Sequence, residues 1–314
     1  MTPGRWVALA VAVPVALALI GWTGFSLVAS VARGSYPFSY TFPVRDGKLA
    51  LNVSAGDITV RQAPASGTAR LAGTVRYGLV RPGISEFTTS TSVNVSLNCT
   101  DSIAGDCGVN ANLDVPAQTA VTLWSNGGDV TASGFSRGIT LWTSGGNVSA
   151  SNLAGALQLN TGGGDLTANG LTGTLVVDTQ GGNVNAGDWT SSGAMMQLNT
   201  GGGDMSVNGL SGDFQLITQG GNVDVSGLAA DTSTTESGGG DVTLAFSRLP
   251  KDVTITSQGG NVTVILPPRS TTYDITTPDN QGGNIDIPSS LVAANSSNKI
   301  TIDSGGGNIT VSQG

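Results

Sequence analysis

The 314-residue sequence contains no histidine, and only 11% of its residues are charged and 5% aromatic. Without an imidazole, neither Ser-His-Asp nor Cys-His catalysis nor a histidine metal site can form. The 13 Lys and Arg against 21 Asp and Glu give a net charge of −8, which argues against a nucleic-acid partner because such binding needs a basic face. The composition therefore excludes several large functional classes, and we expect no cofactor.

Glycine is abundant instead. The chain has 47 glycines, roughly twice the usual share for its length. The other frequent residues are Thr, Ser, Asn and Val, which favour strands and turns over helices. This composition predicts an all-β protein.

The N-terminal segment carries a run of 27 residues, 6–32, without a single charge. As a helix it would be about 40 Å long, enough to cross a hydrocarbon core of about 30 Å. We therefore predict a membrane anchor over residues 1–33, followed by a linker over 34–47. A signal peptide cleaved after Ala32 and a buried soluble helix are the alternatives.

Only two cysteines occur, Cys99 and Cys107, with seven residues between them. A closely spaced pair beyond a membrane segment is typical of a disulfide that closes a loop outside the cytoplasm. The alternative is a pair of unrelated thiols. The expected location is the cell membrane, with one pass and with the β-domain extracytoplasmic.

One motif recurs along the second part of the chain: two glycines followed by Asp or Asn. Successive copies lie 18 to 24 residues apart, and a near-constant period of this kind indicates a solenoid. The Asp or Asn positions are Asp129, Asn147, Asp165, Asn183, Asp204, Asn222, Asp241, Asn261, Asn284 and Asn308.

Apolar columns flank this corner. The first and third residues after the Asp or Asn are apolar in every copy, and alternate residues before the glycines are apolar in six copies, which is the pattern of strands with one buried face. The last inward position before the glycines holds a hydroxyl, and we predict an internal hydroxyl ladder because an unpaired buried hydroxyl is costly. Its members are Ser125, Thr143, Thr161, Thr179, Thr200, Thr218, Ser237, Ser257 and Ser304.

These columns predict a parallel β-solenoid over residues 48–314 with about 10–11 coils, right-handed according to the general bias of parallel crossovers. The first coil is expected at residues 49–60. Residues 61–116 then form an insertion, which we interpret as an antiparallel β-cap that carries the cysteine loop. At the C-terminal end we expect a partner or a second copy to cover the last edge, or irregular strands to blunt it.

The corner Asp and Asn are interpreted as structural. Adjacent carboxylates about 4.8 Å apart would repel each other, and the alternation of Asp with Asn from residue 129 to 261 relieves this repulsion. The glycines are expected because tight corners favour a positive φ. Two alternatives are calcium at the corners and cleavage of a polysaccharide by paired carboxylates, whereas Asp178 and Asp188 are interpreted as solvated loop charges.

Trp124 and Trp142 occupy the same outward column on consecutive predicted coils. Two stacked, exposed indoles would suit binding of a sugar face or of a partner protein. They could equally pack beneath the inserted cap. Both interpretations stay open at the level of the sequence.

The combination resembles the bacterial putative-adhesin domain family of unknown function. The resemblance rests on residues 49–60 with Gly56-Asp57, on the Leu-Asp-Val-Pro phrase at 113–116, and on the recurring Gly-Gly-Asp/Asn corners, and it covers about residues 38–313. It implies a cell-surface, membrane-associated β-solenoid without established enzymatic activity, and it supplies no catalytic residues. Some relatives are linked to envelope-stress signalling.

The sequence thus predicts a membrane-anchored, extracytoplasmic, adhesin-like module that is not an enzyme. It would bind an envelope polymer or a protein partner, with envelope sensing as one such role. The alternative is a polysaccharide lyase or hydrolase on a β-helix, which would need acidic and basic side chains converging on a few adjacent coils.

Overall fold

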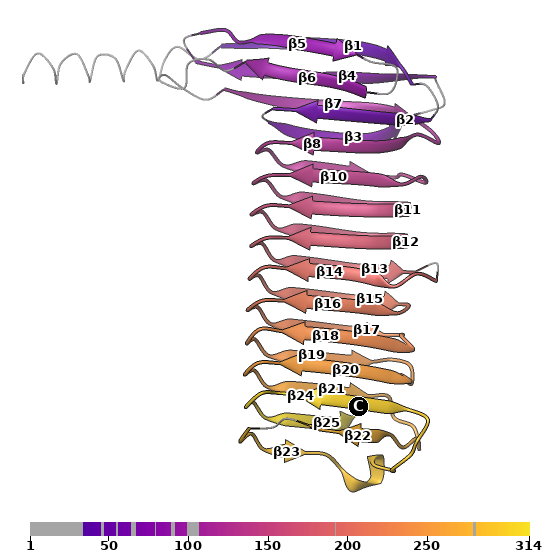
Figure 1. The fold of residues 1–314 in the computed structure, drawn as a ribbon. Helices are drawn as coiled ribbons and strands as arrows, with labels where there is room; N and C mark the ends of the chain where they lie inside the picture. The colour runs from indigo at the N-terminus through magenta and orange to yellow at the C-terminus, as the bar shows by residue number, and fades with distance from the viewer. Residues whose placement is uncertain are drawn as a thin grey trace, which may run out of the picture.

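The computed structural model describes residues 34–44, 47–54, 56–63, 67–78, 80–88, 92–98, 107–191, 193–278 and 281–314. Within these ranges the protein is an all-β, parallel β-solenoid of about nine regular turns beneath a β-cap (Figure 1). The predicted anchor over residues 1–33 lies outside the described residues. Among those that are described, no helix has the length and apolar character needed to cross a membrane. The handedness stays a prediction.

The strands form one hydrogen-bonded system with two broad faces, and β11 and β12 pass from one face to the other. Face A contains, from the cap downward, β5 (Gly83–Thr88), β6 (Ser92–Asn98), β2 (Lys48–Val53), β8 (Ala120–Ser125), β10 (Ile139–Thr143), the second halves of β11 (Val148–Thr161) and β12 (Leu166–Thr179), β14 (Met196–Thr200), β16 (Phe214–Thr218), β18 (Thr232–Ser237), β20 (Asp252–Ser257), β24 (Lys299–Asp303) and β22 (Asp274–Thr276).

Face B contains β1 (Gly34–Pro43), β4 (Thr68–Tyr77), β7 (Gly108–Pro116), β3 (Asp57–Ala63), β9 (Val130–Ser133), the first halves of β11 and β12, β13 (Val184–Thr190), β15 (Met205–Ser211), β17 (Val223–Leu228), β19 (Val242–Phe246), β21 (Val262–Leu266), β25 (Ile309–Gln313) and β23 (Ile285–Asp286). A 3-10 helix, η2 (Ser289–Leu291), is the one helical element among the described residues.

The core is a set of like residues stacked in register. Leu141 lies opposite Leu123 on one side and Leu159 on the other, and all three are buried. Because the strands are in register, alternate residues of every coil point into the same interior column. The apolar columns predicted from the sequence are therefore confirmed, and so is the third column, which contains Phe135, Leu153, Leu171, Trp189, Leu210 and Leu228.

The predicted linker over residues 34–47 is wrong. Residues 34–43 form β1, which pairs antiparallel with β4 along its whole length, from Gly34 opposite Tyr77 to Pro43 opposite Thr68. The physical reason is the alternation of aromatic residues from residue 36 to residue 42, which gives this segment an apolar side that packs against the core.

The sequence predicts an antiparallel cap, but the cap contains both parallel and antiparallel strands. Strands β6 and β7 add a parallel coil directly above β2 and β3, which form the predicted first coil. Only β5, β4 and β1 lie antiparallel to their neighbours. The predicted pairing of Cys99 with Cys107 stays a prediction, because Cys99 lies outside the described residues.

The far end of the column reverses the order of the chain. The coil made by β24 and β25 comes last in the sequence, yet it lies between the β20–β21 coil and the β22–β23 coil. The outermost strands, β22 and β23, have three and two residues. Irregular strands therefore blunt this edge.

Candidate functional site

The buried corner hydroxyls connect neighbouring coils. The Thr161 hydroxyl donates to the carbonyl oxygen of Gly146 in the preceding coil at 2.7 Å, and it accepts the backbone N–H of Gly164 at 3.0 Å. Thr143 makes the same two bonds, to Gly128 and from Gly146. The predicted hydroxyl ladder is thus confirmed, and its function is to satisfy backbone groups that the tight corner removes from the sheet.

The corner Asp and Asn form a second, exposed ladder. The Oδ1 atom of Asp165 accepts the backbone N–H of Asn183 at 2.8 Å, and the N–H of Asp165 donates to Asn147 Oδ1 at 2.8 Å. The ten bonds of this kind range from 2.7 to 3.1 Å. In spatial order the ladder runs through Asp57, Asp129, Asn147, Asp165, Asn183, Asp204, Asn222, Asp241, Asn261, Asn308 and Asn284. Each member holds the next coil in register.

The ladder predicts a difference between two substitutions at one position. Asp165→Asn keeps the oxygen that accepts the Asn183 N–H, so its effect on the free energy of unfolding should stay within about 0.5 kcal/mol. Asp165→Ala removes that acceptor and should cost about 1 kcal/mol. Chemical denaturation of both variants measures the difference, and equal losses would show that the charge matters and the hydrogen bond does not.

The corner glycines have a different cause from the one predicted. Apart from Gly56, whose φ is +121°, the glycine before each ladder residue, such as Gly164, does not have a positive φ. Instead, a Cβ built on Gly164 would overlap the carbonyl oxygen of Gly146 in the neighbouring coil. The equivalent overlap occurs at Gly128, Gly146, Gly182, Gly203, Gly221, Gly240, Gly260, Gly283 and Gly307. Close approach of stacked backbones, and not left-handed geometry, requires glycine here.

The remaining carboxylates show no catalytic pairing in the described part of the chain. Asp178 and Asp188 are exposed, as predicted, but they lie on β12 and β13 and not in loops. Asp231 pairs with Lys251 at 2.6 Å and with Arg248 at 2.7 Å on the surface, and the hydrogen bond from Lys251, together with the Arg248 charge, lowers the pKa of the Asp231 carboxyl. No group of three His, Cys, Asp or Glu that could hold a metal ion occurs within the described ranges.

Trp124 and Trp142 are brought together as predicted and lie side by side on β8 and β10. Their side chains are 38% and 44% exposed, so the interpretation that the cap covers them is wrong. The reason is the register: the neighbour of Trp124 on the cap side is Asn52 of β2, whose short side chain leaves the indole uncovered. The pair therefore presents apolar surface on face A.

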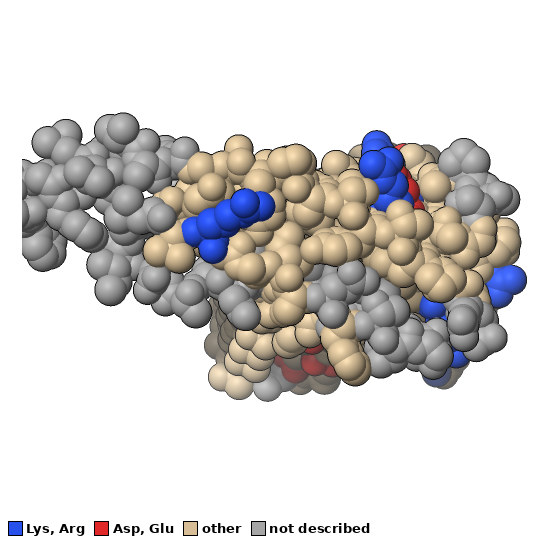
Figure 2. All heavy atoms as spheres, turned by 90° about the horizontal axis from the view of Figure 1, so that it is seen from above, with Lys and Arg blue, Asp and Glu red and all other residues tan. Residues whose placement is uncertain are grey.

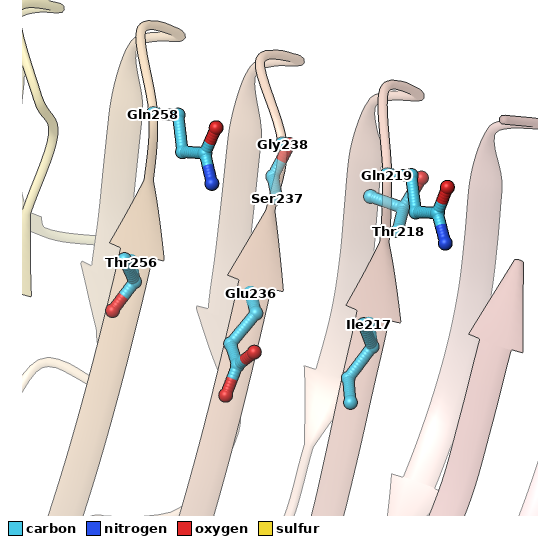
Figure 3. A pocket seen from close by; sticks show the side chains of 8 residues that line it. All are labelled: Ile217, Thr218, Gln219, Glu236, Ser237, Gly238, Thr256 and Gln258. Atoms are coloured by element: carbon cyan, nitrogen blue, oxygen red, sulfur yellow. The ribbon is translucent and has the colours of Figure 1, made fainter. Parts of the chain in front are cut away.

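Face A also has a shallow depression, which the sequence analysis does not predict. It has a volume of about 270 Å³ and lies at Gly238, between the side chains of Gln219 and Gln258 on the two flanking coils (Figure 3). Glu236 and Ile217 line it as well. Amide, carboxylate and apolar groups at this spacing can hydrogen-bond a hydroxyl-rich ligand, but they include no nucleophile with a base.

The signal for this depression was present in the chain. From residue 180 to residue 258, the residue before each Gly-Gly pair alternates between glutamine and glycine: Gln180, Gly201, Gln219, Gly238 and Gln258. Because the coils are in register, each such glycine leaves a gap between two glutamines. Only the stacking shows that these residues are neighbours.

Comparison with solved structures finds proteins of similar length and low identity. A putative adhesin from Bacteroides fragilis is 12% identical, with 88% of this chain and 97% of that chain covered and a TM-score of 0.30. A putative adhesin from Parabacteroides distasonis is 12% identical, with 89% and 97% covered and a TM-score of 0.33. One from Parabacteroides merdae is 13% identical, with 88% and 96% covered and a TM-score of 0.29.

These TM-scores are too low to support an argument about function, and the search of curated proteins finds no match. A family model gives the clearer result. The model described as Toastrack DUF4097 matches residues 41–312, from the first cap strand to the last coil, in agreement with the resemblance seen in the sequence. The chain therefore belongs to the Toastrack DUF4097 family.

Proposed function

We propose that the protein is a membrane-anchored, extracytoplasmic, adhesin-like rod that binds an envelope polymer without acting as an enzyme. The uncharged run over residues 6–32 supports the anchor. Bacterial surface modules of this shape present long outer faces, on which a ligand contacts several coils at once. A role in envelope sensing stays a prediction.

The observation that carries the binding role is the Trp124–Trp142 pair. Large aromatic side chains this exposed are costly to keep in water, and they are enriched where proteins bind partners or ligands. Asn52, which lies next to Trp124 in the same outward column and is exposed, adds a polar group beside the indoles. An indole face next to an amide group suits the apolar face of a sugar ring and its hydroxyls.

The chemistry of the corners speaks against the lyase or hydrolase alternative. Each ladder carboxylate already accepts a backbone N–H, and each corner hydroxyl already bonds at least one backbone group, with two for Thr161. A general acid or base must be able to exchange a proton with its substrate. Repeated corner side chains that hold the coils together are therefore poor candidates for catalysis.

Co-sedimentation with purified cell-wall sacculi tests this proposal. We expect the full chain, in detergent micelles, to sediment with sacculi, and the double variant Trp124→Ala/Trp142→Ala to bind at least about tenfold more weakly, because aromatic hot spots contribute about 2 kcal/mol or more. Phe87→Ala, which removes an even more exposed aromatic side chain from β5 of the cap, is the matched control and should bind normally.

Unchanged binding of the double variant would contradict the assignment of the tryptophans. Absence of binding by the unaltered chain to sacculi would contradict the proposed envelope-polymer ligand. Circular dichroism of each variant shows whether the fold is kept.

A further inference from the structure

The start of β1 fixes how far the cap can lie from the predicted anchor. The uncharged run ends at residue 32, and Gly34 already pairs with Tyr77 as the first residue of β1. Two residues of extended chain span at most about 7 Å. If the run crosses a bilayer, the cap has no slack and must lie against the membrane surface.

The residues at this point form what we call the N-terminal corner: Gly34, Tyr36, Tyr77 and Arg81. The Tyr36 and Tyr77 rings lie 6.0 Å apart, and the Arg81 guanidinium lies 4.0 Å above the Tyr36 ring. The Tyr36 hydroxyl donates to the Pro82 carbonyl at 2.7 Å, and Gly34 packs directly on the Tyr77 ring. The two tyrosines are half-buried, and Arg81 is exposed.

This combination matches the region between lipid tails and water. Tyrosine is enriched at that level because its ring is apolar and its hydroxyl is polar. An arginine held flat on an aromatic ring keeps the edge of its guanidinium available, and a guanidinium binds phosphate oxygens in a bidentate manner. The corner thus offers both groups that a lipid headgroup layer requires.

The distribution of charge along the molecule favours the same orientation. Residues 34–116 contain six Lys or Arg and six Asp or Glu, whereas residues 117–314 contain five Lys or Arg and 15 Asp or Glu. Figure 2 looks down on the cap and shows Lys and Arg side chains spread over the described part of this end. An anionic bilayer would repel the coils, with their charge of −10, but not the cap.

We propose that the N-terminal corner binds the headgroups of anionic phospholipids, so that the rod stands on the membrane and points its tryptophan pair and far end outward. This inference rests on the anchoring part of the proposed function. It adds a lipid-binding site, with Arg81 on the lipid phosphate and with Tyr36 and Tyr77 at the headgroup level.

Hydroxyl-radical footprinting with mass spectrometry tests the site on the full chain. The chain is reconstituted in vesicles of phosphatidylcholine alone, in vesicles containing phosphatidylglycerol, and in detergent micelles. We expect oxidation of Tyr36 and Tyr77 to be about fivefold slower in the phosphatidylglycerol vesicles than in micelles, which corresponds to one cation held at an anionic surface. The exposed Trp124 and Trp142 should react equally in all three samples and calibrate the radical dose.

Arg81→Gln should restore at least half of the lost oxidation rate in phosphatidylglycerol vesicles. Arg137→Gln is the matched control, because Arg137 lies on the coils and bonds Gln118, and it should leave the protection unchanged. Equal oxidation of Tyr36 and Tyr77 in vesicles and micelles, for a chain that floats with the vesicles after an alkaline wash, overturns the lipid site alone. A chain that does not float overturns both the site and the anchor.

Discussion

Gly164→Ala is expected to lower the free energy of unfolding by at least about 3 kcal/mol, whereas Gly163→Ala should cost less than about 1 kcal/mol. Gly164 is buried, and a Cβ there would overlap the Gly146 carbonyl oxygen of the preceding coil. This neighbour is backbone, fixed by the sheet above it, so it cannot move aside as a flexible side chain would. Gly163 is exposed, and its Cβ would have no atom within 4 Å.

The two variants are closely matched, because they change adjacent residues by the same single carbon. Chemical denaturation followed by circular dichroism gives the free energy and the slope of the transition. A solenoid is stabilised by contacts between neighbouring coils, so a break at this central corner should also lower the slope by dividing the cooperative unit. Equal stabilities of the two variants would show that the coils can separate at the corner without cost.

The interior of the column was predictable because its information is local and repeated. Each coil carries its own alternation, as in Leu157, Leu159 and Thr161, and a constant period places like residues on top of each other. The same logic gave the hydroxyl ladder and the Asp/Asn ladder. Neither prediction required knowledge of which coils lie at the two ends.

The two ends of the solenoid were harder to predict, because the spatial order of their strands differs from the order of the strands in the sequence. Strand β24 offers five residues with Ile300 and Ile302 inward, while β22 offers only three, so the longer strand pairs with β20 and buries Val253 and Ile255. Whether β22 or β24 pairs with β20 depends on the relative strength of two segments that are separated in the sequence. A local pattern in either segment cannot predict the outcome. The aromatic alternation in β1 is visible in the sequence, but the uncharged run directly before it favours a linker at this place.

The candidate site also has some features that the sequence predicts and others that it does not. The pairing of Trp124 with Trp142 followed from the repeat, but their exposure depended on Asn52, a residue of the cap-side neighbour. The depression at Gly238 required three successive coils to be placed in register. Local chemistry was therefore visible in the sequence, and the surfaces it forms were not.

Thr161→Val is the second change with a large expected effect, about 2–6 kcal/mol. Valine has nearly the shape of threonine, so the substitution leaves no cavity. The change in the free energy of unfolding therefore reports the loss of the hydroxyl alone. Its loss removes the donor to the Gly146 carbonyl and the acceptor for the Gly164 N–H, both inside the column. Each unsatisfied buried group costs about 1–3 kcal/mol.

Thr161→Ser is the control, because it keeps the hydroxyl and removes only a methyl group, at a cost of about 1 kcal/mol. Serine already fills the equivalent position at Ser125, Ser237 and Ser257, where it bonds the same corner groups. The ranking expected from chemical denaturation is therefore threonine, then serine, then valine. If valine proved as stable as serine, the interior hydroxyls would be dispensable, and the coils would be held by apolar burial and the sheet hydrogen bonds alone.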